Sequence, residues 1–302
     1  MEIKTTLAAL PTEARNPLTD NIDQLPTLDM LRLINDEDAK VATAVAAVLP
    51  ETAKAIDAIA ERFNQGGRLF YIGAGTSGRL GVLDASECPP TFSVSPTLFH
   101  AIIAGGDTAL RKSSEQSEDS PDQGAADLAA AGITPQDALI GIAASGRTPY
   151  VLGALAHAKK AGALTIALTC VPNSAMAAAA DISIAPITGS EILTGSTRLK
   201  AGTATKLVLN MLSTGVMIRT GAVYGNLMVN MQTTNAKLVD RAQRIIMAAT
   251  GVDQTKAANL LTAAGTIKTA IVMQKLSIDR TTAEAKLAAH NGNLSALLHP
   301  KT

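Results

Sequence analysis

The alternation of apolar segments with helical ones between residues 69 and 187 constrains the fold more than any other feature. Five apolar runs have the length of buried strands: 69–73, His100–Ala104, Ala138–Ala143, Leu164–Thr169 and Ile182–Ile187. Between most of them lie Ala-rich or amphipathic stretches, such as Gln123–Ala131 and Pro149–Ala161. Strands that alternate with helices predict a doubly wound, flavodoxin-like α/β fold with a five-stranded parallel sheet covered on both faces. Its ligands are expected beyond the carboxyl ends of the strands.

The regions around this core have different patterns. Residues 1–54 predict an N-terminal arm that is irregular to about residue 26 and helical beyond it. One helix is expected to start at Thr27, and a second near Asn35–Asp38, whose acids suit a helix N-terminus. The α/β core is expected over residues 55–220, with a long last helix over Leu199–Thr220. Residues 235–302 then show only short helical patterns: 235–249, 253–264, 267–276 and 280–290. They predict a small all-helical C-terminal domain.

Composition excludes several classes of protein. The 26 basic residues balance 26 acidic ones without a dominant basic cluster, which argues against a nucleic-acid partner. Cys88 and Cys170 are too few for a disulfide framework or a four-thiolate zinc site. Apolar runs of signal-peptide or membrane-spanning length are lacking. We therefore expect a soluble cytoplasmic protein without a membrane partner.

The loop Gly73–Gly78, which joins the first strand to the next helix, predicts an anion site. Gly75, Thr76 and Ser77 offer backbone N–H groups and hydroxyls at one point. The loop also satisfies the G-x-G-x-x-G pattern of dinucleotide sites, but that pattern requires an acidic residue near the end of the next strand. No acid occurs there before Asp107. The hydroxyls favour a phosphomonoester instead.

A second loop of the same chemistry follows the third predicted strand. Ser145, Gly146 and Thr148 precede Pro149, at a helix start where a hydroxyl is often only an N-cap. Two such loops at the ends of separate strands predict opposite walls of a phosphosugar pocket. A third segment, Glu191–Lys200, adds hydroxyls and cations. The predicted substrate and phosphate contacts are Gly75, Thr76, Ser77, Ser145, Gly146, Thr148, Ser196 and Lys200.

Carboxylates near these loops are candidate acids and bases. Glu87 follows Asp84 by about one helical turn and stands just before Pro89, where we expect the helix to end. A negative charge is unfavourable at a helix C-terminus, which suggests a function, although a solvated Glu is the plain alternative. Of Glu115, Glu118 and Asp119, at most one is expected to reach a site. The four histidines have no metal-site spacing, so neither a metal nor a cofactor is predicted.

Several ordered motifs together resemble one family, the bacterial N-acetylmuramic acid 6-phosphate etherases, essentially from end to end. The motifs are Thr12–Asn16, Ile34–Asp38, Gly73–Gly81, Asp84–Pro90, Ile102–Gly105, Gly141–Tyr150, Arg198–Thr203, Lys206–Thr214 and Gly225–Val229. The resemblance implies a sugar isomerase (SIS) domain, a helical C-terminal part and a homodimer.

The resemblance also implies a reaction. It is the cleavage of the D-lactyl ether of N-acetylmuramic acid 6-phosphate to N-acetylglucosamine 6-phosphate and D-lactate, in the recycling of cell-wall amino sugars. By motif match, Glu87 and Glu118 correspond to the two essential carboxylates. Our hypothesis makes Glu118 the base at C2 and Glu87 the acid for lactate departure.

Two alternatives share the predicted fold. An aldose–ketose phosphosugar isomerase also places a base beside a sugar carbonyl. A catalytically silent sugar-phosphate sensor would need no base at all. Sensors of that kind are about twice as long, with a duplicated sugar domain, and this chain lacks the duplication.

Overall fold

The computed structural model describes residues 12–112 and 116–299, so that the first part of the predicted arm and Glu115 lie outside the described residues. The chain forms two compact units. The first comprises the chain up to Ser86 together with Thr97–Ser213. The second comprises Glu87–Pro96 and the chain from Thr214 onward.

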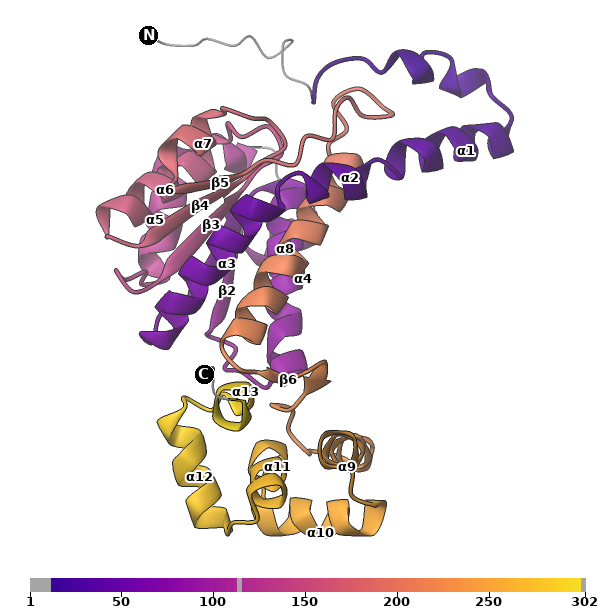
Figure 1. Ribbon diagram of the computed structural model, residues 1–302. Helices are drawn as coiled ribbons and strands as arrows, with labels where there is room; N and C mark the ends of the chain where they lie inside the picture. The colour runs from indigo at the N-terminus through magenta and orange to yellow at the C-terminus, as the bar shows by residue number, and fades with distance from the viewer. Residues whose placement is uncertain (1–11, 113–115, 300–302) are drawn as a thin grey trace. The chain divides into compact units, whose positions relative to one another are not determined.

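A five-stranded parallel sheet forms the centre of the first unit (Figure 1). Its strands are β1 Leu69–Gly73, β2 Phe99–Ile103, β3 Ala138–Ile142, β4 Leu164–Leu168 and β5 Ile182–Ile184. The spatial order β2-β1-β3-β4-β5 confirms the predicted flavodoxin-like fold. Strand β5 is shorter than predicted because Pro186, which has no N–H to donate, follows two residues after its end.

Helices cover both faces of this sheet (Figure 1). One face carries α5 Pro121–Ala130, α6 Pro149–Lys160 and α7 Ala175–Ala179. The other carries α3 Leu49–Asn64 and the parts of α4 Gly75–Phe92 and α8 Lys200–Arg219 that belong to the first unit. Strands β1 and β3 are buried along their whole length, which explains why they read as continuous apolar runs in the sequence.

The arm before the sheet differs from the prediction at one helix boundary. It contains η2 Pro17–Thr19, η3 Ile22–Gln24, α1 Thr27–Asp38 and α2 Val41–Ala46. The acidic segment Asn35–Asp38 ends α1 instead of starting a new helix. The physical reason is tertiary, because buried Glu37 forms ion pairs with Lys40 and Lys200. Helix α3, which follows, carries Pro50 in its first turn, where a proline is well tolerated.

Helix α4 corrects a second expectation. It continues through Pro89 and Pro90 to Phe92. Each proline removes one backbone donor, so the carbonyls of Ala85 and Ser86 lose their usual partners within the helix. The prolines fall in the last turn and a half, where the φ of proline still suits a helix, and Ser93 N–H donates to Pro89 O at 2.9 Å. Glu87 therefore lies inside the helix and not at its end.

The second unit contains the predicted C-terminal helices. They are α9 Ala236–Thr250, α10 Gln254–Ala264, α11 Ile267–Leu276, α12 Arg280–Ala289 and an additional short α13 Leu294–Leu298. Asn235, Asp253 and Asp279 each cap the following helix with a side-chain oxygen. A two-stranded hairpin, β6 Val223–Tyr224 and β7 Leu227–Met228, was not predicted. None of the helices in the described ranges is long and apolar enough to cross a membrane.

Candidate functional site

A cavity lies where the carboxyl ends of β1 and β3 meet. These strands are neighbours in the sheet, and the chain proceeds from β1 to one side and from β3 to the other. Ligands of doubly wound folds bind at such a reversal of strand order. The cavity measures about 230 Å³. Its lining residues all belong to the first unit: Glu13, Ala74, Gly75, Thr76, Ser77, Glu118, Ala143, Ala144, Ser145, Thr148, Thr197, Gly202 and Thr205.

The loop after β1 is shaped by close approach of backbones. A Cβ on Gly73 would stand 2.8 Å from the backbone N of Gly78, and a Cβ on Gly78 would stand 2.7 Å from Gly73 O. Gly75 has a φ of 51°. The glycines therefore let α4 start immediately behind the strand, which brings Thr76 and Ser77 to the cavity wall.

The loop after β3 also lines the cavity, with Ser145 and Thr148. Thr148 occupies the N-cap position of α6, yet its side chain makes no capping hydrogen bond. The alternative that this hydroxyl only caps its helix is thus wrong. Gly146 does not line the cavity, but its φ of 65° forms the turn, and a Cβ there would stand 2.3 Å from the Ser174 hydroxyl.

Two helix N-termini lie at this cavity. Helices α4 and α6 both begin at the cavity-lining loops. Their first backbone N–H groups and their dipoles favour an anion there. The start of α8 is different, because buried Glu191 accepts from the backbone N–H groups of Lys200 at 3.0 Å and Ala201 at 2.9 Å. An anion would therefore bind towards α4 and α6.

Two carboxylates line the same cavity. Of the two described members of the predicted acidic loop, Glu118, on the short helix η5 Gln116–Glu118, lines the cavity and Asp119 does not. Glu13 was not predicted as a site residue, although the motif Thr12–Asn16 drew attention to its segment. Glu13 belongs to an irregular turn far from the strands in sequence, so strand-end reasoning could not find it. Thr197 falls in the segment Glu191–Lys200, whose hydroxyls were noted, but it was not named as a contact, and Thr205 lies on α8 and was missed.

Lys200 takes part in a buried ion pair. Its side chain is 2% exposed, and its ammonium donates to Glu37 Oε2 at 2.6 Å. Burial opposes ionisation of Glu37, but hydrogen bonds and charges from Lys200 and Lys40 outweigh it and lower the pKa of that carboxyl. Lys200 thus joins α1 to α8. Neither Lys200 nor Ser196 lines the cavity, and their contact with substrate stays an untested prediction.

Glu87 and Asp84 differ sharply in environment although both lie on α4. Glu87 is exposed and belongs to the second unit. Twelve residues of helix separate it from Gly75, which corresponds to roughly 18 Å along the axis of α4. Asp84 is buried and accepts hydrogen bonds from Tyr71 at 2.8 Å and Asn210 at 2.7 Å. Burial raises the pKa of Asp84. Its hydrogen bonds fasten α4 to β1 and α8.

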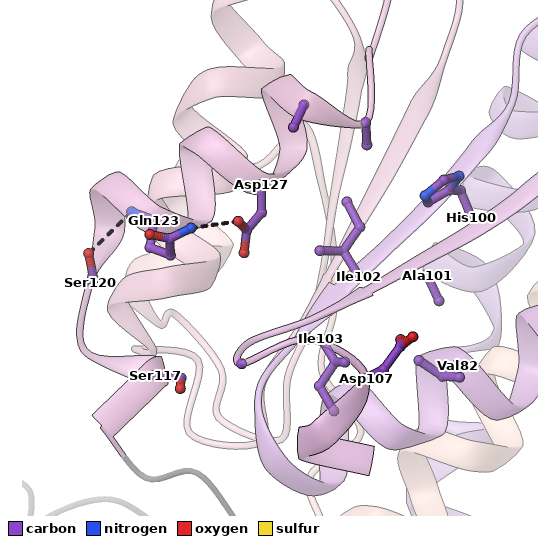
Figure 2. A pocket seen from close by; sticks show the side chains of 14 residues that line it. Val82, His100, Ala101, Ile102, Ile103, Asp107, Ser117, Ser120, Gln123 and Asp127 are labelled. Carbon is purple, nitrogen blue, oxygen red and sulfur yellow. Dashed lines mark hydrogen bonds between the residues drawn. The ribbon is translucent and has the colours of Figure 1, made fainter.

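A larger cavity of about 880 Å³ runs beside the edge strand β2 (Figure 2). Three of its polar lining residues, Ser120, Gln123 and Asp127, bind one another. Gln123 donates its backbone N–H to the Ser120 hydroxyl at 3.1 Å and its side-chain amide to Asp127 at 2.6 Å. Asp127 also accepts from the Tyr150 hydroxyl at 2.6 Å. Ser120, Gln123 and Asp127 are thus already paired within this cavity, whereas the hydroxyls of two strand-end loops gather in the smaller one.

No cluster of three metal-ligating side chains occurs within residues 12–112 and 116–299.

Comparison with known proteins identifies the family. Residues 51–159 match the model of the glucokinase regulatory protein N-terminal SIS domain, and residues 111–215 match the SIS domain model. The N-acetylmuramic acid 6-phosphate etherase of Aliivibrio fischeri is 55% identical over 96% of this chain and 97% of its own. That of Cronobacter sakazakii is 55% identical over 97% and 99%, and that of Clostridium beijerinckii is 54% identical over 97% and 96%. The chain therefore belongs to the N-acetylmuramic acid 6-phosphate etherase family.

Proposed function

We propose that the cavity at the ends of β1 and β3 is where this enzyme cleaves the D-lactyl ether of N-acetylmuramic acid 6-phosphate. The observation that carries the proposal is the meeting of two hydroxyl-bearing loops with Glu118 in one cavity. The loops suit a phosphate, and the carboxylate suits a base beside the sugar. The products are N-acetylglucosamine 6-phosphate and D-lactate.

The phosphate is held by Thr76, Ser77, Ser145 and Thr148. Their hydroxyls line opposite walls of the cavity, and α4 and α6 direct N–H groups to the same point. Hydrogen bonds to an ionised phosphate are stronger than neutral ones, so these contacts anchor the substrate at C6. The rest of the sugar then extends along the remaining wall, where the carboxylates lie.

Glu118 removes the proton on C2. In the open-chain sugar this proton is acidified by the aldehyde at C1, and its removal leaves an enolate. The bond from C3 to the lactyl oxygen then breaks, and lactate leaves with a proton supplied by an acid. Water adds to C3 of the unsaturated aldehyde while C2 regains a proton, which yields N-acetylglucosamine 6-phosphate. A positioned carboxylate is the kind of group that performs such proton transfers.

Glu87 is the acid for lactate departure and the base for water addition. This assignment rests on its place in the motif Asp84–Pro90. Its carboxylate is exposed, but roughly 18 Å of α4 separate it from Gly75 within one chain, so the Glu87 that serves a cavity would come from the second chain of the proposed homodimer. The division of labour between Glu87 and Glu118 is tested by the last experiment of the Discussion.

We further propose a cytoplasmic homodimer that acts in the recycling of cell-wall amino sugars. Cys88 and Cys170 are both buried and form no disulfide, which suits a reducing compartment. Helix α1 presents Leu28, 58% exposed, and Leu31, 52% exposed. Large apolar side chains gathered on one exposed helix are typical of a surface that a partner covers.

The experiment is to incubate the protein with N-acetylmuramic acid 6-phosphate and to measure D-lactate with a coupled dehydrogenase. We expect stoichiometric lactate and N-acetylglucosamine 6-phosphate. An aldose–ketose isomerase would release no lactate and would instead interconvert sugar phosphates. A sensor would bind the substrate and return it unchanged. Either of these results contradicts the proposed function.

A further inference from the structure

Glu13 lies in the cavity although nothing in the proposed reaction uses it. Its carboxylate faces Gly195, where an added Cβ would stand 3.1 Å from Glu13 Oε2. Gly195 has a φ of 75°, a backbone conformation that side chains rarely adopt. The glycine therefore leaves room for the carboxylate at the cavity wall.

The turn that carries Glu13 is fixed to the body of the first unit. Thr12 is 1% exposed, and the Asn16 side chain accepts from the N–H of Leu18 at 3.1 Å. The Thr19 hydroxyl donates to Ile192 O at 2.9 Å, which ties the arm to the segment that precedes α8. A glutamate that merely solvates a tail needs no such anchors. The anchors hold the Glu13 carboxylate in place before any ligand arrives.

The chemistry of the cavity restricts what Glu13 can bind. An ionised carboxylate only accepts hydrogen bonds. It repels a phosphate, which the hydroxyls and helix N-termini on the other walls attract. A phosphosugar also carries neutral donors, namely its hydroxyl groups and, in an N-acetylated amino sugar, one amide N–H. These donors are the groups that a carboxylate beside the sugar would recognise.

We propose that Glu13 is a substrate-binding residue that accepts hydrogen bonds from the neutral donors of the sugar and so orients it over Glu118. This inference rests on the proposed function of the cavity as a phosphosugar site. Hydrogen bonds to charged groups contribute enough to affinity that their removal weakens binding about tenfold to a hundredfold.

The test measures dissociation constants by calorimetry for Glu13→Gln and for a matched control, Asp20→Asn. Asp20 lies in the same arm, is exposed and carries the same charge. For Glu13→Gln we expect binding of N-acetylglucosamine 6-phosphate to weaken about tenfold or more, with inorganic phosphate bound as in the wild type. Asp20→Asn should bind both as the wild type does, and Glu13→Asp should recover part of the loss.

A third ligand, glucose 6-phosphate, separates the two kinds of donor. If Glu13→Gln loses as much affinity for glucose 6-phosphate as for N-acetylglucosamine 6-phosphate, Glu13 binds hydroxyl groups. If its affinity for glucose 6-phosphate equals that of the wild type, Glu13 binds the amide N–H. The inference is overturned if Glu13→Gln binds the amino sugar phosphate as tightly as the wild type. It is also overturned if phosphate and sugar phosphate weaken equally, since that indicates a distorted cavity. A wild type that binds these ligands but releases no lactate would contradict the proposed reaction and leave the comparison of Glu13 variants valid.

Discussion

Asp137 shows how much one buried carboxylate contributes at the scale of a residue. Its side chain is 1% exposed and pairs with the Arg68 guanidinium at 2.8 Å. It also accepts from the backbone N–H groups of Arg68 at 2.7 Å and Thr134 at 2.8 Å. Burial opposes ionisation of Asp137, but the hydrogen bonds from Arg68 and Thr134 outweigh it and lower its pKa. The carboxylate thus holds the starts of β1 and β3 together.

Stability should depend on pH through this residue. Because the pKa of Asp137 is lower in the folded than in the unfolded state, its contribution is present above the ordinary pKa of an Asp and is lost as pH falls through the lowered value. We expect Asp137→Asn to reduce the free energy of unfolding at neutral pH by about 3 kcal/mol. The variant should also lose less stability than the wild type between about pH 5 and pH 3. Urea unfolding across this pH range provides the measurement, and equal slopes for the two proteins would contradict the account.

Single residues also mark the limit of what the sequence predicts about the site. Thr76, Ser77, Ser145 and Thr148 could be placed because they directly follow strands whose carboxyl ends share one edge of the sheet. Glu13 could not, because hydrogen bonds between segments far apart in the chain, such as that from Thr19 to Ile192, set its position.

At the scale of elements, α5 and α6 pack closely through two glycines. A Cβ on Gly124 of α5 would stand 1.8 Å from Tyr150 O, and a Cβ on Gly153 of α6 would stand 1.9 Å from Pro121 O. Both neighbours are backbone atoms, which cannot move without displacing a helix. This packing buries Leu128 and Leu155 against the sheet.

Gly124→Ala should therefore destabilise the protein by about 3 kcal/mol or more, because the two helices must separate. The control is Gly202→Ala on α8, where the nearest atom would stand 3.5 Å away. Alanine restricts the unfolded backbone more than glycine does, so the control should be as stable as the wild type or more stable by about 0.5–1 kcal/mol. Thermal unfolding of both variants measures the difference. A Gly124→Ala protein that melts with the wild type would show that α5 and α6 are not in this contact.

The sequence predicted the strands and most helices but not every boundary. Apolar runs placed the strands to within a few residues, since burial on both faces leaves an unmistakable pattern. Local sequence patterns gave the wrong helix boundary where contacts between distant segments determine it. The acids of Asn35–Asp38 suit a helix start, yet buried Glu37 pairs with Lys200, which lies far away in the chain. Pro89 and Pro90 predicted a helix end, yet α4 tolerates them near its C-terminus.

At the scale of the whole molecule, exposed leucines on α1 favour association of two chains. We expect a particle of twice 31.0 kDa in sedimentation velocity. The double variant Leu28→Asp with Leu31→Asp should be a monomer, because burying two unpaired carboxylates in an interface costs free energy. Leu276→Asp on α11, where the native side chain is 38% exposed, is the control and should remain a dimer. A wild-type monomer at micromolar concentration would refute the proposed assembly.

In the proposed reaction, Glu118 removes the C2 proton and Glu87 supplies the proton that lactate takes with it. Its most direct test follows two events for Glu118→Gln and Glu87→Gln with N-acetylmuramic acid 6-phosphate in deuterated water. Exchange at C2 is read by nuclear magnetic resonance, and D-lactate by the coupled assay. We expect Glu118→Gln to lose both C2 exchange and lactate release. We expect Glu87→Gln to keep C2 exchange while its lactate release falls by about a hundredfold or more. Exchange at C2 by Glu118→Gln at the wild-type rate would contradict it.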